Sequence, residues 1–571
     1  MRQPGGHLLV ECLVQQGVEV VFGVPGESYL AVLEGLHAWQ PAIRFVTNRQ
    51  EAGSAFMADA HARLTGRPGV CLVTRGPGAA NAAIGLHTAA QDSVPLVMFV
   101  GDVASDMRDR EAFQEIDFAS FFGPNTKGLA KRVERIDHVD RIPEYVARAF
   151  ATAMQGRPGP VVVVLPEDML TTLTEARPVA RIEPAVAAPS AATIQAMAQH
   201  LAQAKRPLVL AGGAGWTPQA AADLQAFAQA WQLPVANAFR FQDVFDNHHP
   251  CYAGDVGIGV APALAQAVRE ADVLLALGCR LGEITTSGYT LLQVPEPRQA
   301  LLHLHPAADE LHRVYHAQVA GIATMPEAAA ALAATKPPAQ TPWQAHTQAL
   351  RQAYLDNLTT PAAPYPIDLA EVVRSCAQLL PPEAVLTNGA GNFAGWLHRF
   401  FMYHGWAKGH KTQLAPTVGA MGYGVPAGIA ANLVTGRTVL TFSGDGDFLM
   451  NGQELATAVQ HGGRSIVVLL NNGMYGTIRM HQEREYPTHV SGSTLRNPDF
   501  CALAKAYGYA AERVTRTADF APALQRALAR EQGTLLELPI DPEQITSRTT
   551  LQAIRQQALQ RQQAPSAPPE T

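Results

Sequence analysis

The chain has 571 residues, of which 47% are apolar and 16% are charged. This length exceeds one hydrophobic core and predicts three or four domains of roughly 150 residues each. The 43 basic and 49 acidic residues give a formal net charge of -6. That balance excludes a strong general affinity for nucleic acid or for an anionic membrane surface, so we expect small molecules as partners.

The N-terminus and the cysteines are typical of a cytoplasmic protein. Met1 to Val10 lacks a basic segment followed by a long apolar run, and no stretch approaches the ~18 apolar residues of a membrane span. The six cysteines lie far apart without a C-x-x-C pair, which indicates reduced and mostly buried thiols.

Short β-branched runs alternate with helical stretches in the first 170 residues. The runs are Val20 to Val24, Ile43 to Thr47, Val70 to Thr74, Leu96 to Gly101 and Val161 to Leu165. Such alternation predicts a parallel α/β sheet, so we expect an N-terminal domain at residues 1–170. A segment rich in proline and alanine, Thr171 to Ser190, then reads as a linker.

Two further α/β units follow in the same style. A central domain is expected at residues 190–335, with a strand in Ala271 to Gly278. A C-terminal domain is expected at residues 360–545, with strands at Ala384 to Leu386, Thr438 to Phe442 and Ser465 to Leu470, before a weakly helical, then disordered tail at 546–571. The predicted fold is α/β, with three doubly wound parallel-sheet domains in series.

The strongest chemical signal lies in the C-terminal unit. One strand runs into Gly444-Asp445-Gly446, and the next delivers Asn471-Asn472, with 24 residues between Gly446 and Asn471. Two parallel strands joined by a helix end at the same edge of a sheet, so Asp445 and Asn472 are expected to converge. Carboxylate and amide oxygens suit Mg²⁺, and the glycines let backbone N–H groups approach a diphosphate.

This pattern resembles the thiamine-diphosphate enzyme family, whose signature is G-D-G followed about two dozen residues later by N-N. The resemblance spans nearly the whole chain and implies a pyrimidine-binding N-terminal, a central and a diphosphate-binding C-terminal domain. It also implies thiamine diphosphate and Mg²⁺ as cofactors, with Asp445, Asn472 and the Met474 carbonyl as metal ligands. The other cofactor contacts that it implies are Gly26, Glu27, Pro77, Asn81, Gly391, Asn392, Phe393, Gly419, Met421, Gly444, Gly446, Asp447 and Tyr475.

Glu51 is the expected catalytic acid. It follows the strand Ile43 to Thr47 and opens the helix Ala52 to Leu64. By itself this position is equally typical of a carboxylate that stabilises a helix N-terminus. The segment around Glu51 closely resembles the family motif R-H-E-x-G-A, in which the acid donates a hydrogen bond to the aminopyrimidine; Gln50 replaces the histidine of that motif.

Within the family, Thr74 to Asn81 and Ala112 to Glu115 resemble acetolactate synthases. That resemblance brings Phe113, Gln114 and Lys127 to the substrate. It implies an enzyme that decarboxylates a pyruvate-type 2-oxo acid and ligates the product to a second carbonyl compound. A homodimer or homotetramer is also implied, because the two halves of the site usually come from different subunits.

Several positions depart from the synthase pattern. His481 stands in place of the tryptophan that shapes the second-substrate pocket, Glu283 replaces part of G-A-R-F-D-D-R, and His303 and His305 replace acidic residues. FAD therefore stays a secondary expectation, and Arg280, Arg240 and His481 are candidates for contact with another substrate or for structural roles. The alternatives are a thiamine-dependent lyase or decarboxylase, a flavin-linked oxidase of the pyruvate oxidase type, and a non-catalytic thiamine-binding protein.

Overall fold

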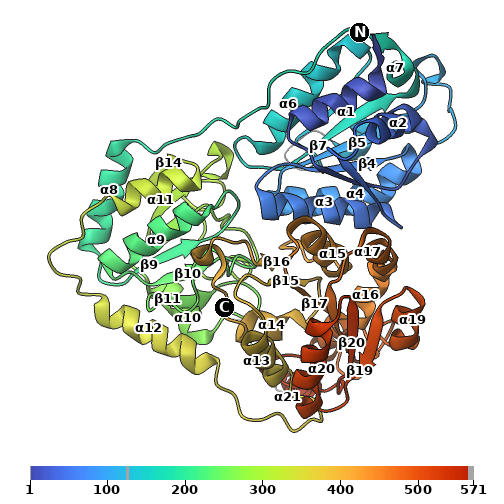
Figure 1. The fold of residues 1–571 in the computed structure, drawn as a ribbon. Coiled ribbons are helices and arrows are strands. Elements are labelled where there is room, and N and C mark those ends of the chain that lie inside the picture. Colours follow the sequence, from blue (N-terminus) through green and yellow to red (C-terminus); the bar gives the residue numbers. More distant parts are fainter. Residues whose placement is uncertain (1, 124–127, 564–571) are drawn as a thin grey trace.

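The computed structural model describes residues 2–123 and 128–563. Three lobes are visible in Figure 1: the N-terminal domain in blue, the central domain in green and yellow, and the C-terminal domain in orange and red. Each lobe is built on one six-stranded sheet in which every strand pair is parallel. Three doubly wound parallel-sheet domains in series are therefore confirmed. Among the described residues, no helix is both long and apolar enough to cross a membrane.

The N-terminal sheet has the strand order β3-β2-β4-β5-β7-β6. Its strands are β2 (Val20–Gly23), β3 (Arg44–Thr47), β4 (Gly69–Val73), β5 (Leu96–Asp102), β6 (Arg132–Arg135) and β7 (Pro160–Pro166). One face packs on α1 (Gly5–Gln15), α2 (Leu30–Ala38) and α6 (Ile142–Met154), and the other on α3 (Glu51–Thr65) and α4 (Gly76–Asp92). The short elements are β1 (Gln3–Pro4), β8 (Leu173–Thr174), α5 (Phe118–Phe122) and α7 (Glu167–Thr171). Apolar side chains on both faces explain why these strands read as continuous hydrophobic runs.

The central sheet has the order β11-β10-β9-β12-β13-β14. Its strands are β9 (Pro207–Ala211), β10 (Val235–Asn237), β11 (Tyr252–Asp255), β12 (Val273–Leu277), β13 (Ala300–His305) and β14 (Val319–Ile322). Helices α8 (Ala191–Gln203), α9 (Pro218–Trp231) and α11 (Met325–Ala333) cover one face, and α10 (Pro262–Glu270) covers the other, near α12 (Gln344–Asn357). The central domain thus has apolar cores of its own.

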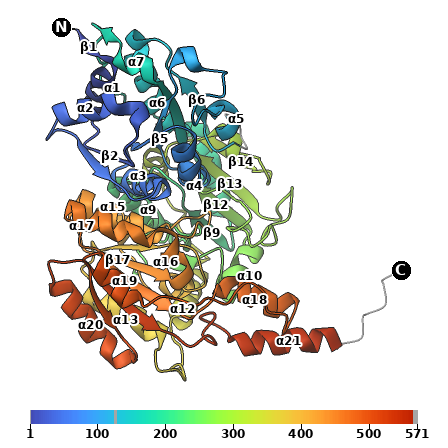
Figure 2. The same cartoon turned by 90° about the vertical axis from the view of Figure 1, so that its right-hand side faces the viewer.

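The C-terminal sheet repeats the strand pattern of the N-terminal one, with the order β16-β15-β17-β18-β20-β19. Its strands are β15 (Val385–Asn388), β16 (Gln413–Leu414), β17 (Val439–Gly444), β18 (Ile466–Asn471), β19 (Ala510–Arg513) and β20 (Thr534–Pro539). The helices are α13 (Leu369–Leu379), α14 (Ala394–Phe400), α15 (Gly424–Thr435), α16 (Asp445–Asn451), α17 (Leu455–His461), α18 (Gly476–Glu485), α19 (Phe500–Ala506), α20 (Thr517–Ala529) and α21 (Leu551–Gln563). Figure 2 shows α21 beside α18, projecting from the body of the molecule.

One apolar core crosses from the N-terminal to the C-terminal domain. Helix α3 packs against α15, and the ring of Phe56 contacts the ring of Tyr423 with centroids 5.3 Å apart. The central domain meets the C-terminal domain through Met402 and Trp406, which pack against the central core, and through a polar joint. There, buried Lys411 donates to Asp243 at 2.6 Å, and the other carboxylate oxygen of Asp243 accepts the backbone amides of Thr412 and Gln413. The outer two domains therefore pack as one unit.

Candidate active site

A cavity of about 240 Å³ lies at the carboxyl edge of the C-terminal sheet. The strand order reverses between β15 and β17, and ligands of open α/β sheets bind at such a switch point. The loops that follow these two strands, with the turn after β18, form the wall. The lining includes Ala390, Gly391, Asn392, Phe393, Trp396, Gly419, Met421, Gly444, Asp445, Gly446, Asp447, Asn472, Met474, Tyr475, Thr477, Ile478, Ile540, Gln544 and Ile545.

Asp445 is the first residue of α16 and lies 3% exposed at this edge. One carboxylate oxygen accepts the backbone N–H of Gly446 at 2.9 Å, and the other accepts the backbone N–H of Gly473 at 2.8 Å and the side chain of Asn497 at 2.7 Å. Burial raises the pKa of the Asp445 carboxyl, although these donors act in the opposite direction. Asp445 is thus tied directly to the turn that carries Asn472.

The turn after β18 presents the other two proposed metal ligands. The side-chain oxygen of Asn472 accepts the N–H of Met474 at 3.2 Å, and Gly473 adopts a positive φ of 68° that lets the chain reverse. Tyr475 lies over Gly446, where a Cβ atom would come within 2.5 Å of its ring. Carboxylate, amide and carbonyl oxygens from Asp445, Asn472 and Met474 line one cavity, and this donor set fits a hard divalent cation.

Asp447 faces the backbone around the cavity rather than standing free. Its carboxylate accepts the amides of Ala390 at 3.1 Å and Gly422 at 2.8 Å, and the hydroxyl of Ser443 at 2.6 Å. Complete burial raises the pKa of Asp447 to about 6. These bonds join the loops after β15 and before α15 to the start of α16, which explains how a second carboxylate is accommodated next to Asp445.

Packing and hydrogen bonds to neighbouring residues hold the Gly391-Asn392-Phe393 segment. The ring of Phe393 lies against Gly444, where a Cβ would stand 3.0 Å from it. The side-chain oxygen of Asn392 accepts a hydrogen bond from the Thr477 hydroxyl at 3.0 Å. The backbone N–H of Asn392 donates to the same hydroxyl at 3.1 Å. Nearby, Gly419 has a φ of 73°, and it lines the cavity with the half-buried Met421.

Glu51 begins α3 at the carboxyl edge of the N-terminal sheet, and its carboxylate accepts the side-chain amide of Asn81 at 3.0 Å. Gln50 caps the helix, since its side-chain oxygen accepts the amides of Ala52 and Gly53. In this chain the residue that replaces the motif's histidine therefore secures the helix that Glu51 opens.

A buried carboxylate from the C-terminal domain fixes the turn before Glu51. Glu454 accepts the side chain of Asn48 at 3.0 Å and the backbone amides of Arg49 at 3.1 Å and Gln50 at 3.0 Å. Burial raises the pKa of Glu454. Neither Glu454 nor Asn497 is among the residues predicted from sequence, since an isolated Glu or Asn carries no motif signal of its own.

The remaining predicted residues of the N-terminal domain gather at its own switch point, between β2 and β4. Gly26 and Glu27 follow β2, and Pro77 lies in the first turn of α4 after β4. Gln114 has a φ of 65°, and its carbonyl accepts the N–H of Gly76, which places the loop over the start of α4; Phe113 on that loop is 71% exposed. Lys127 lies outside the described residues.

Among the residues that the structure describes, the cavity is lined by only one of the two sets of predicted residues. The walls of the cavity come from residues 390–545, all in the C-terminal domain, and Glu51 is not among them. Exposed apolar side chains stand close in sequence to both sets: Ile84 and Phe113 in the N-terminal domain, and Ile478 in the C-terminal domain.

The candidate substrate residues Arg240 and Arg280 have structural partners. Arg240 is buried and donates to the carbonyl of Pro416, and burial lowers its pKa to about 10. Arg280 donates to the carbonyl of Gln91 at 2.9 Å and pairs with Glu310 at 3.3 Å. Both contacts are of the kind expected for structural roles. His481 is exposed on α18.

The fold and this cavity define the class of α/β proteins that bind a ligand at the carboxyl edge of a parallel sheet, at its switch point. Models of the thiamine pyrophosphate enzyme N-terminal TPP binding domain, central domain and C-terminal TPP binding domain match residues 3–121, 194–332 and 389–538. The chain is 30% identical over 540 residues to the acetolactate synthase isozyme 2 large subunit of Escherichia coli (strain K12), covering 94% of this chain and 95% of that protein.

Two other relatives agree. A probable acetolactate synthase large subunit of Methanocaldococcus jannaschii is 30% identical over 557 residues, covering 94% of this chain and 92% of that protein. The acetolactate synthase large subunit of Corynebacterium glutamicum is 29% identical over 546 residues, covering 92% and 85%. The chain belongs to the thiamine pyrophosphate enzyme family, as an acetolactate synthase-like member.

Proposed function

We propose that the protein decarboxylates a 2-oxo acid of the pyruvate type and joins the resulting fragment to a second carbonyl compound. The observation that carries this proposal is the convergence of Asp445, Asn472 and Met474 on one cavity in a chain similar over most of its length to acetolactate synthases. The named relatives favour this reaction over the lyase, oxidase and non-catalytic alternatives.

In this proposal Asp445, Asn472 and the carbonyl of Met474 hold Mg²⁺, and backbone amides near Gly444 and Gly446 approach the diphosphate. When bound, thiamine diphosphate supplies the carbon nucleophile and the electron sink for loss of carbon dioxide. Met421, Trp396 and the isoleucines of the lining exclude water from the reacting end of the cavity. Asp447 organises the surrounding loops through its three donors.

Glu51 handles the proton at the pyrimidine end. Its carboxyl group, oriented by Asn81, would donate a hydrogen bond to the ring nitrogen of the cofactor. Gln114 and Phe113, on the loop over the start of α4, would approach the substrate from the same domain.

The reaction is tested by incubating the protein with pyruvate, thiamine diphosphate and Mg²⁺ and identifying the products by mass spectrometry. We expect acetolactate from pyruvate alone, and a mixed product when 2-oxobutanoate is added. The variant Asp445→Asn serves as the inactive control, because it removes one charged metal ligand. A product limited to the aldehyde would assign a decarboxylase instead, and acetyl phosphate formation would assign an oxidase.

We further propose that two copies build each active site, as a homodimer or a pair of dimers. Support comes from Glu51, which is missing from the lining of its own chain's cavity, and from the exposed apolar residues beside both sets of site residues. Co-expression of Glu51→Gln with Asp445→Asn provides the test. Random pairing should restore about a quarter of wild-type activity, since half of the dimers then hold one intact site. Activity that stays at the level of the single variants would contradict a shared site.

We propose that catalysis proceeds without FAD. The central sheet reverses its strand order between β9 and β12, where a dinucleotide would bind. A cavity of about 810 Å³ lies at this edge, lined in part by Gly213, Pro306 and Met325, and a Cβ at Gly213 would lie 1.9 Å from the carbonyl oxygen of Gly278. Buried Glu310 forms ion pairs with Arg157 at 2.8 Å and with Arg280 at 3.3 Å. These two arginines therefore have a carboxylate partner in place of a diphosphate.

The histidines of β13 add to this argument against FAD. His303 is buried, its ring nitrogen lies 3.1 Å from the carbonyl of Cys279, and burial lowers its pKa to about 4. A neutral imidazole replaces the acid that would accept ribose hydroxyls. The protein purified without added flavin is expected to lack the visible flavin absorption band and to be fully active. Copurification of one FAD per chain would contradict this.

The domain limits 1–170, 190–335 and 360–545, the tail and a cytoplasmic location belong to the same proposal. The similarity to biosynthetic enzymes and the charge balance support the location.

A further inference from the structure

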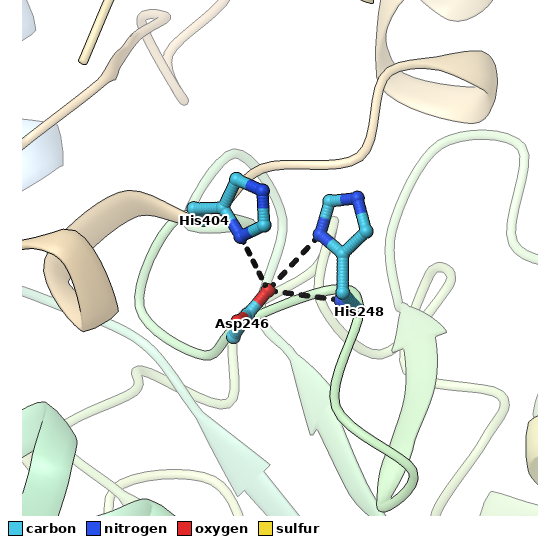
Figure 3. A group of neighbouring side chains, drawn as sticks. All are labelled: Asp246, His248 and His404. Carbon is cyan, nitrogen blue, oxygen red and sulfur yellow. Dashed lines mark hydrogen bonds and ion pairs between the residues drawn. The ribbon is translucent and has the colours of Figure 1, made fainter. Parts of the chain in front are cut away.

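Three metal-ligating side chains meet far along the chain from the cofactor motifs, at the joint between the central and C-terminal domains. Asp246 and His248 come from the loop after β10, and His404 from the segment after α14 (Figure 3). The two imidazole rings stack with centroids 4.0 Å apart and planes 13° from parallel. Both rings direct Nδ1 toward the same carboxylate oxygen of Asp246, at 3.1 Å for His248 and 3.2 Å for His404.

The backbone beneath these side chains is fixed. Asn247, between the first two ligands, donates its N–H to the carbonyl of Tyr403, and the N–H of Tyr403 returns to the side-chain oxygen of Asn247, both at 2.9 Å. The side-chain amide of Asn247 also donates to two carbonyls of its own loop. Because Tyr403 precedes His404, this pairing holds all three ligand positions in register without any ion.

The distances fit a small tetrahedral ion. Imidazole nitrogens and carboxylate oxygens bind zinc at about 2.0–2.1 Å, so adjacent ligand atoms of a tetrahedron stand roughly 3.3 Å apart. The two Nδ1-to-oxygen separations, 3.1 Å and 3.2 Å, match this edge, and all three ligand atoms lie within 4.8 Å of one another. The His248 and His404 side chains are 44% and 31% exposed, which leaves them free to adjust and opens the fourth position to water.

A second cluster of potential ligands shows what an unsuitable site looks like. Asp499, Cys501 and Glu537 also lie close together. There Arg513 pairs with Glu537 at 2.9 Å and with Asp499 at 3.4 Å, so a guanidinium already fills the place of a cation. In the Asp246 cluster, Arg351 donates instead to the carbonyls of Asn247 and His248.

We propose that Asp246, His248 and His404 form a binding site for a divalent transition metal of the zinc type, which ties the central domain to the C-terminal domain. Two imidazoles and one carboxylate are a donor set that suits zinc, cobalt and nickel better than magnesium. On binding, each ring carries its hydrogen on Nε2, with a neutral imidazole changing tautomer and an imidazolium releasing one proton to solvent, and the metal lies between Nδ1 and the carboxylate. The site is independent of the catalytic proposal, because none of its residues lines the cofactor cavity.

The test uses the untagged full-length chain, stripped of metal by a chelator and then saturated with thiamine diphosphate and Mg²⁺. Calorimetric titration with Zn²⁺ should give one binding event per chain, and titration with Co²⁺ should give the visible absorption bands of a tetrahedral nitrogen and oxygen site. His404→Gln and Asp246→Asn should each weaken binding by at least about tenfold and abolish the cobalt bands. His248→Gln should do the same.

His316→Gln is the matched control. His316 is exposed and lies 3.2 Å from Glu296, elsewhere in the central domain. The substitution therefore removes a histidine from an ordinary histidine–carboxylate pair. It should leave zinc affinity unchanged. Gel filtration and circular dichroism establish that each variant is folded. Wild-type protein that binds no zinc at micromolar concentration, or His404→Gln that binds it as tightly as wild type, would overturn the proposal.

Discussion

Glutamine at position 51 keeps the length of the side chain and an acceptor for Asn81, but it cannot transfer a proton. Loss of a general acid–base group costs about 10²–10⁴-fold in rate, and we expect the kcat of Glu51→Gln to fall within that range. Affinity for thiamine diphosphate should change little, because the proposed diphosphate contacts lie in the C-terminal domain. Steady-state kinetics and calorimetry measure the two quantities separately.

Glu175→Gln is a suitable control for that variant, since Glu175 is an exposed carboxylate in the segment directly after the N-terminal domain and pairs only with the exposed Arg2, at 3.5 Å. Its kcat should equal that of wild type. Undiminished turnover in Glu51→Gln would show that another group handles the proton.

Asp447 gives a prediction about pH. Its folded-state pKa of about 6 lies above the ordinary 3.8, so the carboxyl stabilises the fold when protonated and this stability is lost as the pH rises from about 4 through 6. Asp447→Asn keeps an oxygen for the amides of Ala390 and Gly422 and removes the charge. As the pH rises through this range, the unfolding free energy of wild type should therefore fall relative to that of the variant, by up to about 3 kcal/mol.

Urea unfolding at a series of pH values measures that difference. A constant difference between variant and wild type from pH 4 to 7 would be inconsistent with the raised pKa.

Single residues also show where the sequence was sufficient and where it was not. Asp445 and Asn472 could be placed at one edge, because strand periodicity and spacing decide where two parallel strands end. The directions of side chains could not be predicted: Asp447 turns to backbone amides and Gln50 caps its own helix. Both depend on contacts with loops that are distant in sequence.

At the scale of elements, the segment that joins α16 to α17 fixes the turn before Glu51 through Glu454. Glu454→Ala removes the acceptor of four donors: the buried side chains of Asn48 and Thr457 and the partly buried backbone amides of Arg49 and Gln50. Each unsatisfied buried donor costs about 1–3 kcal/mol, so we expect stability to fall by on the order of 3 kcal/mol or more. The folded fraction should also show a reduced kcat, because the position of Glu51 is no longer fixed.

Glu454→Gln separates these effects. Both backbone amides donate to the same Glu454 oxygen, which glutamine retains, so its stability and kcat should lie between those of wild type and the alanine variant. Thermal unfolding and kinetics report the order. An alanine variant with wild-type kcat would mean that Glu454 only stabilises the fold.

The elements found from sequence were those buried on both faces. Runs such as that of β5 and β7 are continuously apolar and were predicted within a residue or two. Strand β6 was missed, because its sequence Arg-Val-Glu-Arg is charged and lies at the sheet edge. The single helix expected between β17 and β18 is divided in two: α16 begins at Asp445, directly after β17, and α17 begins at Leu455.

At the scale of the whole molecule, the distribution of apolar cores predicts how the protein unfolds. The N-terminal and C-terminal domains share one core, while the central domain has separate cores and a polar joint with Lys411 and Asp243. We expect two calorimetric transitions, one for the central domain and one for the other two together. Trp231 lies in the core of the central domain, so Trp231→Ala should lower the midpoint temperature of the central-domain transition only.

A single transition that shifts as a whole in the tryptophan variant would show that the three domains are coupled.

The completeness of the active site is the property of the whole molecule that sequence could not supply. Motifs locate Glu51 and Asp445, but whether one chain brings them together depends on how the domains pack.

The shared core has a consequence for the connectivity of the chain. Although the central domain stands between the other two in sequence, it has cores of its own, contacts the C-terminal domain through Asp243 and Lys411, and is joined to the other domains by two connecting segments. The first of these, at residues 175–190, contains no helix or strand. A cut there would place the N-terminal domain on a separate polypeptide, which the core shared by α3 and α15 would still hold against the C-terminal domain, so the protein should lend itself to split-gene expression.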